Sequence, residues 1–243
     1  MKNHTGTIVL AVAIVVTAWI LGDSWNYRFK TQETISVTGL ASKDFSSDLI
    51  VWNGNYSRKS LDLRSAYAQL KADENNLRKY LLGKGVDTKE LVFSAIAIDK
   101  QFNYSYDESG RQTSVEFTGY NLTQSVTVES KNIEKVEAIS REVTELIEQG
   151  IEFYSSQPAY YYTKLADLKL DLLAKAAEDA RKRAETIATN SGSRIDRVRK
   201  ATMGVFQITG QNSNEDYSYG GVFNTESREK TASITIRMEF QVD

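Results

Sequence analysis

The clearest pattern of hydrophobic and polar positions lies at the C-terminal end of the chain. One set of alternate positions is apolar: Ala232, Ile234, Ile236, Met238, Phe240 and Val242. The set between them is polar: Ser233, Thr235, Arg237, Glu239 and Gln241. Because successive side chains of a strand point to opposite faces, this alternation predicts a strand with one buried face and one exposed face. Such strands are typical of an antiparallel sheet that helices cover on one side.

The longest helical pattern covers residues 163–191, with Pro158 before it and Gly192 after it. Its apolar positions recur at helical spacing, with leucines first and alanines afterwards: Leu165, Leu168, Leu172, Ala176, Ala180, Ala184 and Ala188. Small residues every four positions let a helix backbone lie close to its neighbour. We therefore expect a structural helix packed closely on a sheet.

The remaining patterns are shorter and indicate alternating strands and helices. We expect further helices at 60–82 and 131–149, and further strands at 33–38, 49–57, 91–104, 115–129, 151–155 and 195–208. A turn at 107–110 makes the strands on either side of it a long hairpin.

The order strand, helix, strand, strand occurs twice, at about 48–130 and 151–243, and the 131–149 helix joins the two units. This order predicts an α+β fold in which two repeats contribute antiparallel sheets covered by helices. We expect residues 26–243 to form this domain.

The N-terminal residues 1–25 form an apolar segment without a charge between Thr5 and Gly22. A run of about 18 such residues is at the short end of what spans a bilayer. An uncleaved transmembrane anchor is favoured, and a signal peptide cleaved after Ala18 is the alternative. Both export the rest of the chain. The anchoring side chains would be Ile8, Leu10, Val12, Ile14, Trp19 and Leu21.

Composition removes several classes of chemistry. A formal net charge of −2 gives no general basic surface for nucleic acid. There is no cysteine, and the only histidine is His4, inside the N-terminal segment. The folded domain therefore has no thiolate or imidazole for catalysis or metal binding, and no glycine-rich phosphate loop occurs. We predict no catalytic, cofactor-binding or metal-binding residues, and a protein that is not an enzyme.

Two groups of tyrosines are candidate ligand or assembly contacts. Tyr217 and Tyr219 lie in a polar connection at 209–230, where disorder is the favoured interpretation and a contact the alternative. Tyr160 and Tyr161 precede the long helix, where burial at the helix start is favoured over a sugar-stacking platform.

The middle of the chain carries a family resemblance. Its residues are the run 119–128 (GYNLTQSVTV), the helix from Ile133 to Ile147, Gly150-Ile151, Phe153 and the run 176–185 (AAEDARKRAE). In this order they resemble the SIMPL-domain family over about residues 35–243. The resemblance implies an exported envelope protein. The family includes a periplasmic immunogenic protein, at least one member similar to a ring-forming, channel-like oligomer, and others linked to stress tolerance. It supplies no catalytic residues.

The expected function is a non-enzymatic cell-envelope protein, a self-associating scaffold or channel-like oligomer with a stress-related role. The alternative is a periplasmic domain that binds a sugar or an envelope fragment, or is weakly catalytic. We expect contact with the inner membrane through the N-terminal segment, a periplasmic domain and homo-oligomers. After signal cleavage the domain would instead be soluble in the periplasm. We expect no cofactor and no nucleic acid, and the sequence identifies no other protein partner.

Overall fold

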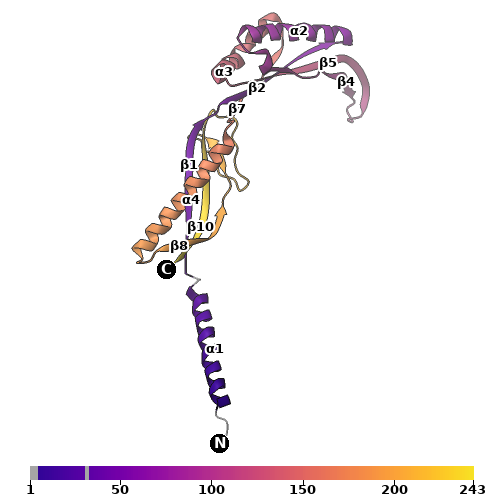
Figure 1. Ribbon diagram of the computed structural model, residues 1–243. Helices are drawn as coiled ribbons and strands as arrows, with labels where there is room; N and C mark the ends of the chain where they lie inside the picture. Colours follow the sequence, from indigo (N-terminus) through magenta and orange to yellow (C-terminus); the bar gives the residue numbers. More distant parts are fainter. Residues whose placement is uncertain (1–4, 31–32) are drawn as a thin grey trace.

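The computed structural model describes residues 5–30 and 33–243, so His4 lies outside it. An N-terminal helix precedes two lobes, each with its own sheet and hydrophobic core (Figure 1). The helices are α1 (Thr5–Lys30), α2 (Leu63–Gly83), α3 (Ile133–Glu142) and α4 (Leu165–Asn190), with 3₁₀ helices η1 (Thr88–Glu90) and η2 (Val143–Gln149). The strands are β1 (Thr34–Ser46), β2 (Leu49–Ser60), β3 (Leu91–Phe93), β4 (Ala97–Tyr106), β5 (Gln112–Ser130), β6 (Phe153–Ser155), β7 (Ala159–Tyr161), β8 (Ile195–Met203), β9 (Gln207–Gly210) and β10 (Glu229–Val242).

The α4 lobe consists of β1 and of the elements from α4 to β10. Its antiparallel sheet has the order β1-β10-β8, and β9 also pairs with β10. The helix α4 lies along one face of this sheet (Figure 1). The predicted apolar set of the last strand is buried from Ala232 to Phe240, and the alanine stripe of α4 is fully buried. Both sequence predictions are confirmed.

Close packing in the α4 lobe depends on Gly39 in β1. A Cβ atom at this position would lie 2.2 Å from the carbonyl oxygen of Ala176 and 2.6 Å from the amide nitrogen of Ala180. The next residue, Leu40, donates its amide to the Asp179 carboxylate at 2.9 Å. The helix backbone therefore rests almost directly on the strand backbone, which only small residues on both sides permit.

The α2 lobe consists of the elements from β2 to β7. Its antiparallel sheet has the order β3-β5-β2-β6, with β4 pairing β5 and β7 pairing β2. Large buried side chains, Trp52 and Tyr56 among them, fill the space under α2 and α3. A partly buried ion pair joins β2 to α2, in which Arg58 Nη2 donates to the buried Asp73 Oδ1 at 2.8 Å.

The fold is α+β with antiparallel sheets, as the sequence predicts, but the two-repeat architecture is not confirmed. The strand β1 lies before the first predicted repeat and pairs with β10 of the second. The strands β6 and β7 belong to the second predicted repeat and pair with β2 of the first. Hydrophobic periodicity assigns a strand to a buried face but not to a partner, so the element order was a poor guide to the sheets.

The expected single helix at 131–149 is two elements. The α-helix α3 ends at Glu142 and η2 continues to Gln149, where Gly150 takes a left-handed conformation with φ 75°. A 3₁₀ helix has three residues per turn, so it does not keep the apolar face of an α-helix. Ile147, which an unbroken α-helix would place one turn after Val143 on the buried side, is therefore 60% exposed.

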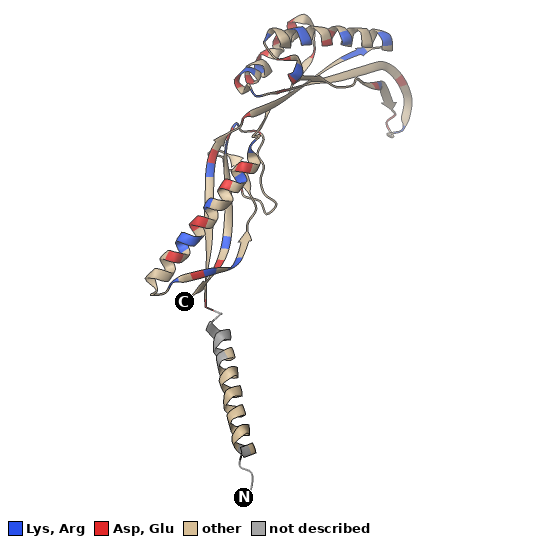
Figure 2. Cartoon of the chain, viewed as in Figure 1, with Lys and Arg blue, Asp and Glu red and all other residues tan. Residues whose placement is uncertain are grey.

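The N-terminal helix α1 carries apolar side chains that are exposed along its described length, including Ile8, Leu10 and Trp19. No residue from Thr5 to Gly22 is charged, and the described part of this stretch is tan in Figure 2. Among the helices that the structure describes, none is both long and apolar enough to cross a membrane. The expectation of a transmembrane anchor is therefore not supported.

Candidate interaction surfaces

The longest exposed feature of the lobes is the hairpin of β4 and the first part of β5, residues 97–119, which we call the arm. All ten residues of β4 are exposed, and so are the first seven of β5. The arm curves away from α2 and α3, beyond the part of the sheet that those helices cover (Figure 1). The sequence predicted this hairpin but gave no reason to expect it uncovered.

One face of the arm is aromatic. Tyr104 pairs across the hairpin with Val115, and Phe102 pairs with Phe117, so their side chains lie on the same side. The rings of Phe102 and Phe117 are 5.7 Å apart, and those of Phe117 and Tyr120 are 5.1 Å apart. Phe102 and Tyr106 are 42% and 62% exposed. The face is an ordered aromatic ladder that stays in contact with solvent.

The tip of the arm is a rigid, charged turn at the predicted position. Asp107 Oδ1 accepts hydrogen bonds from the amide and hydroxyl of Ser109 and from the amide of Arg111, at 2.9, 2.6 and 2.9 Å. The Ser109 hydroxyl and the Arg111 amide hold the pKa of the Asp107 carboxyl below its usual range. Asp107 is therefore ionised at neutral pH, in the form that accepts these hydrogen bonds.

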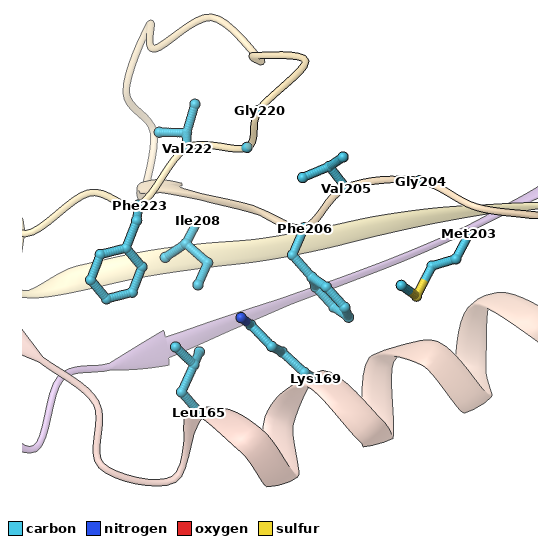
Figure 3. A pocket seen from close by; sticks show the side chains of 11 residues that line it. Leu165, Lys169, Met203, Gly204, Val205, Phe206, Ile208, Gly220, Val222 and Phe223 are labelled. Carbon is cyan, nitrogen blue, oxygen red and sulfur yellow. The ribbon is translucent and has the colours of Figure 1, made fainter.

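A groove lies in the α4 lobe between the start of α4 and the connection from β8 to β9 (Figure 3). It has a volume of about 600 Å³. Its lining is mostly apolar and includes Leu165, Met203, Val205, Phe206, Val222 and Phe223. The one charged side chain in this lining is Lys169, whose Nζ lies 5.5 Å from the centre of the Phe206 ring. Its shape and lining suit an apolar occupant with a negative charge at its rim.

The connection at 211–228 forms one wall of this groove and is held by polar contacts. The Gln207 side chain donates to Ser218 O at 2.8 Å and accepts from the amide of Val222 at 3.0 Å. The Glu215 carboxylate accepts from the amide of Gly210 at 2.8 Å and from the side-chain amide of Asn224, and these bonds lower its pKa, the Asn224 bond most strongly. The polar residues of this connection thus hold it in place.

Two of the predicted contact tyrosines come together. Tyr217 and Tyr219 are strongly exposed and line a second hollow of about 320 Å³ beside the groove, together with Leu40 and Thr235. The hydroxyl of Tyr217 accepts a hydrogen bond from Ser233 Oγ at 3.5 Å. Tyr217 is thus partly fixed.

The other two predicted tyrosines lie elsewhere. Tyr160 and Tyr161 are half-buried in β7 and do not line the Tyr217 hollow. Tyr160 donates its hydroxyl to Glu137 at 2.9 Å, and burial, followed by this bond, raises its pKa to about 12. These contacts are those of aromatic side chains packed before the long helix, which is the favoured interpretation.

The two lobes meet at a buried lysine that sequence reasoning missed. Lys230 in β10 is 2% exposed, and its Nζ donates to the carbonyl oxygen of Tyr160 in β7 at 2.6 Å. Burial lowers the pKa of Lys230 to about 8. Nearby, Asp48 accepts from the amide and hydroxyl of Thr163, both at 2.7 Å. The Lys230 bond joins the two lobes, and the Asp48 bonds join the two chain segments that connect them. In the sequence, Lys230 is one polar residue at a strand start, and nothing there marks it as buried.

The structure thus defines a class: a two-lobed α+β protein with exposed apolar surfaces and, within the residues that it describes, no group of three side chains suited to a metal ion. Residues 35–242 match the family model SIMPL, described as a protein of unknown function (DUF541). The chain belongs to the SIMPL family, which confirms the resemblance of its middle segments. No curated protein matches the chain.

Proposed function

We propose that the chain is a non-enzymatic protein of the cell envelope that self-associates through its arm into a scaffold or channel-like oligomer. The observation that carries this proposal is the aromatic face of the arm, which is ordered and yet uncovered. A stress-related role is implied only by the family resemblance.

The arm resembles an interface more than a free surface. An aromatic side chain buries about 150–250 Å² in a core or interface, so each half-exposed ring leaves on the order of 100 Å² in water. A contiguous set of such rings approaches the few hundred Å² at which exposed apolar patches mark interaction sites. A two-stranded ribbon is also only marginally stable by itself, so a partner on its apolar face would stabilise the arm.

The proposal is tested by the mass of the full chain in solution. The chain, purified in a mild detergent because α1 exposes apolar side chains, is measured by light scattering over a range of concentrations. We expect a stable particle with a mass several times 27.3 kDa after correction for detergent. A monomer at every concentration would contradict self-association.

The envelope location has its own support and test. The apolar side chains of α1, such as Ile14 and Leu21, are exposed and would favour either an export signal or attachment to lipid. Fractionation of expressing cells, with mass spectrometry of the N-terminus, separates these two. Recovery of the intact chain from the cytoplasmic fraction would contradict export.

A second candidate function is binding of a sugar or envelope fragment at the hollow beside the groove. It is favoured by the exposed rings of Tyr217 and Tyr219, with Gln207 and Thr235 as polar neighbours. Thermal-shift measurements with such ligands would show a rise that Tyr217→Ala abolishes. An equal rise in the variant would exclude Tyr217 from the site.

A further inference from the structure

We propose that the aromatic face of one copy's arm inserts into the groove between α4 and the β8–β9 connection of the next copy. This inference rests on the proposed self-association and names its two contact surfaces. Each copy would then give an arm to one neighbour and a groove to another.

The two surfaces match in apolar character and in scale. The arm presents Phe102, Tyr104 and Phe117, which are between 39% and 49% exposed. The groove presents Met203, Val205 and Phe223, which are about half exposed. A space of about 600 Å³ is within the range of sites that bury an apolar group of several rings. Docking would cover both surfaces at once.

Their charges are opposite. The arm has four carboxylates, at Asp99, Asp107, Glu108 and Glu116, against two cations, Lys100 and Arg111. The strand β8 leads into the groove wall and, with the residue before it, carries Arg194, Arg197, Arg199 and Lys200 against Asp196 alone. In Figure 3, the Lys169 side chain reaches from α4 toward the groove lining. A negative arm against this basic strand gains attraction and register.

Charge also favours the groove of a neighbouring copy over its arm as the surface that the arm contacts. Two arms packed face to face would bring together two surfaces that each carry more carboxylates than cations, which is unfavourable. An arm on the apolar groove, whose lining has Lys169 as its one charged side chain, avoids that repulsion. Arm and groove are different surfaces on different lobes, so a contact in which each copy engages two neighbours is heterologous and generates a closed ring or a filament.

The areas agree with a contact of this kind. A stable interface buries about 800 Å² on each partner. The exposed rings of the arm supply about half of that by the estimate of 100 Å² each, and the polar edge of β4 can supply the rest. In a ring, each copy takes part in two such contacts.

The absence of cysteine gives a direct test. The full chain carrying Tyr104→Cys and Val205→Cys is treated, as purified, with a short thiol-specific cross-linker. We expect a ladder of covalent dimers, trimers and higher multiples. Each copy carries one thiol on its arm and one in its groove, so it can be linked to two neighbours. The control carries Ser105→Cys with Val205→Cys. It places the thiol on the opposite face of the same strand and should give at least a tenfold weaker ladder.

The results of cross-linking and light scattering distinguish the arm-to-groove contact from the other possibilities. Cross-linking of the single Tyr104→Cys variant to dimers would show arms face to face and overturn the groove. Oligomers by light scattering without any ladder would overturn the inference and leave self-association standing. A monomeric wild type would overturn both. If the first pair unfolds the chain, Tyr106→Cys with Met203→Cys replaces it, since both side chains are more than half exposed.

Discussion

In both lobes a helix covers a sheet. The lobes differ in the length of that helix relative to a long strand of the sheet. At about 1.5 Å per helical residue and 3.3 Å per strand residue, the 26 residues of α4 span about 39 Å and the 14 residues of β10 about 46 Å. In the other lobe, the 21 residues of α2 span about 31 Å and the 19 residues of β5 about 63 Å.

This difference explains why only the α2 lobe has an arm. From Gly119 to Ser130, β5 alternates between buried and less buried positions, as a covered strand does. From Gln112 to Thr118 it is exposed at every position. The same strand is thus core at one end and surface at the other, because the helices end before the strand does. The helix α4 thus covers most of its own sheet, whereas the helices of the α2 lobe leave the arm uncovered.

The largest effect is expected at the tight contact of the α4 lobe. In Gly39→Val, the new side chain would meet the backbone of α4, since even a Cβ would lie 2.2 Å from Ala176 O. We expect a loss of more than about 4 kcal/mol in the free energy of unfolding of this lobe. Hydrogen exchange should show the amides of α4 opening first.

The control for that variant is Gly83→Ala at the end of α2, where nothing lies within 4 Å of the Cβ that the substitution would add. It should change stability little. Because the two lobes have separate cores, Gly39→Val should leave the protection of buried Trp52 nearly intact. Simultaneous loss of protection in both lobes would show that they are a single cooperative unit.

The next largest effect is expected at the partly buried ion pair of the α2 lobe. In Arg58→Met, the Asp73 side chain loses its charged partner while the residue is only 4% exposed. Breaking a fully buried pair costs about 3–5 kcal/mol, and because the Arg58 side chain is 28% exposed we expect a loss near the lower end of that range. Unfolding followed by Trp52 fluorescence measures it.

The matched control is Arg181→Met, which breaks an exposed pair with Glu185 on α4. Exposed pairs contribute about 0–1 kcal/mol, so this variant should unfold almost like the wild type. Equal losses in the two variants would contradict the assignment of Arg58 and Asp73 to the core.

A smaller effect is expected where the lobes meet. The pKa of Lys230 is about 8 in the folded chain, against 10.5 for an ordinary lysine. Below pH 8, Lys230 is protonated in both the folded and the unfolded chain. The folded chain then bears the full free-energy cost of burying the charged ammonium group. Between pH 8 and 10 the unfolded chain binds more protons, so stability should rise with pH, by up to about 1.4 kcal/mol per unit.

The Lys230→Met variant should lack this rise in the free energy of unfolding between pH 8 and 10. Denaturant unfolding of both proteins at pH 7, 8, 9 and 10 gives the difference curve, which removes contributions from other groups. A difference that does not change with pH would show that Lys230 titrates normally.

The parts of the fold that the sequence predicted are those set by local spacing. The alanines of α4 and the alternation of β10 fix which face is buried, whatever the partner. The pairing of β1 with β10 was not predictable in this way, since Ile35 and Phe240 meet across the whole chain. Equally, the burial of Lys230 follows from a contact with Tyr160, which is distant in sequence.

The four tyrosines that the sequence predicts as contacts lie in two places, and their role stays a prediction. Tyr217 and Tyr219 line one hollow, while Tyr160 and Tyr161 are half-buried in β7. The aromatic face of the arm has a visible signal, in that Phe102, Tyr104 and Tyr106 recur at a spacing of two. That spacing indicates a strand with an apolar face, but whether a helix covers it depends on the length of α2 relative to β5.

The most direct test of the central claim is the particle mass of the Phe102→Ser, Phe117→Ser double variant, measured by light scattering beside the wild type and Gln101→Ser. Gln101 lies on the arm's polar face. We expect the double variant to be a monomer while the wild type and Gln101→Ser are oligomers. Trp52 should report nearly unchanged stability, because the replaced rings lie outside the core. A double variant that unfolds with the wild-type midpoint and keeps the wild-type mass would contradict the account.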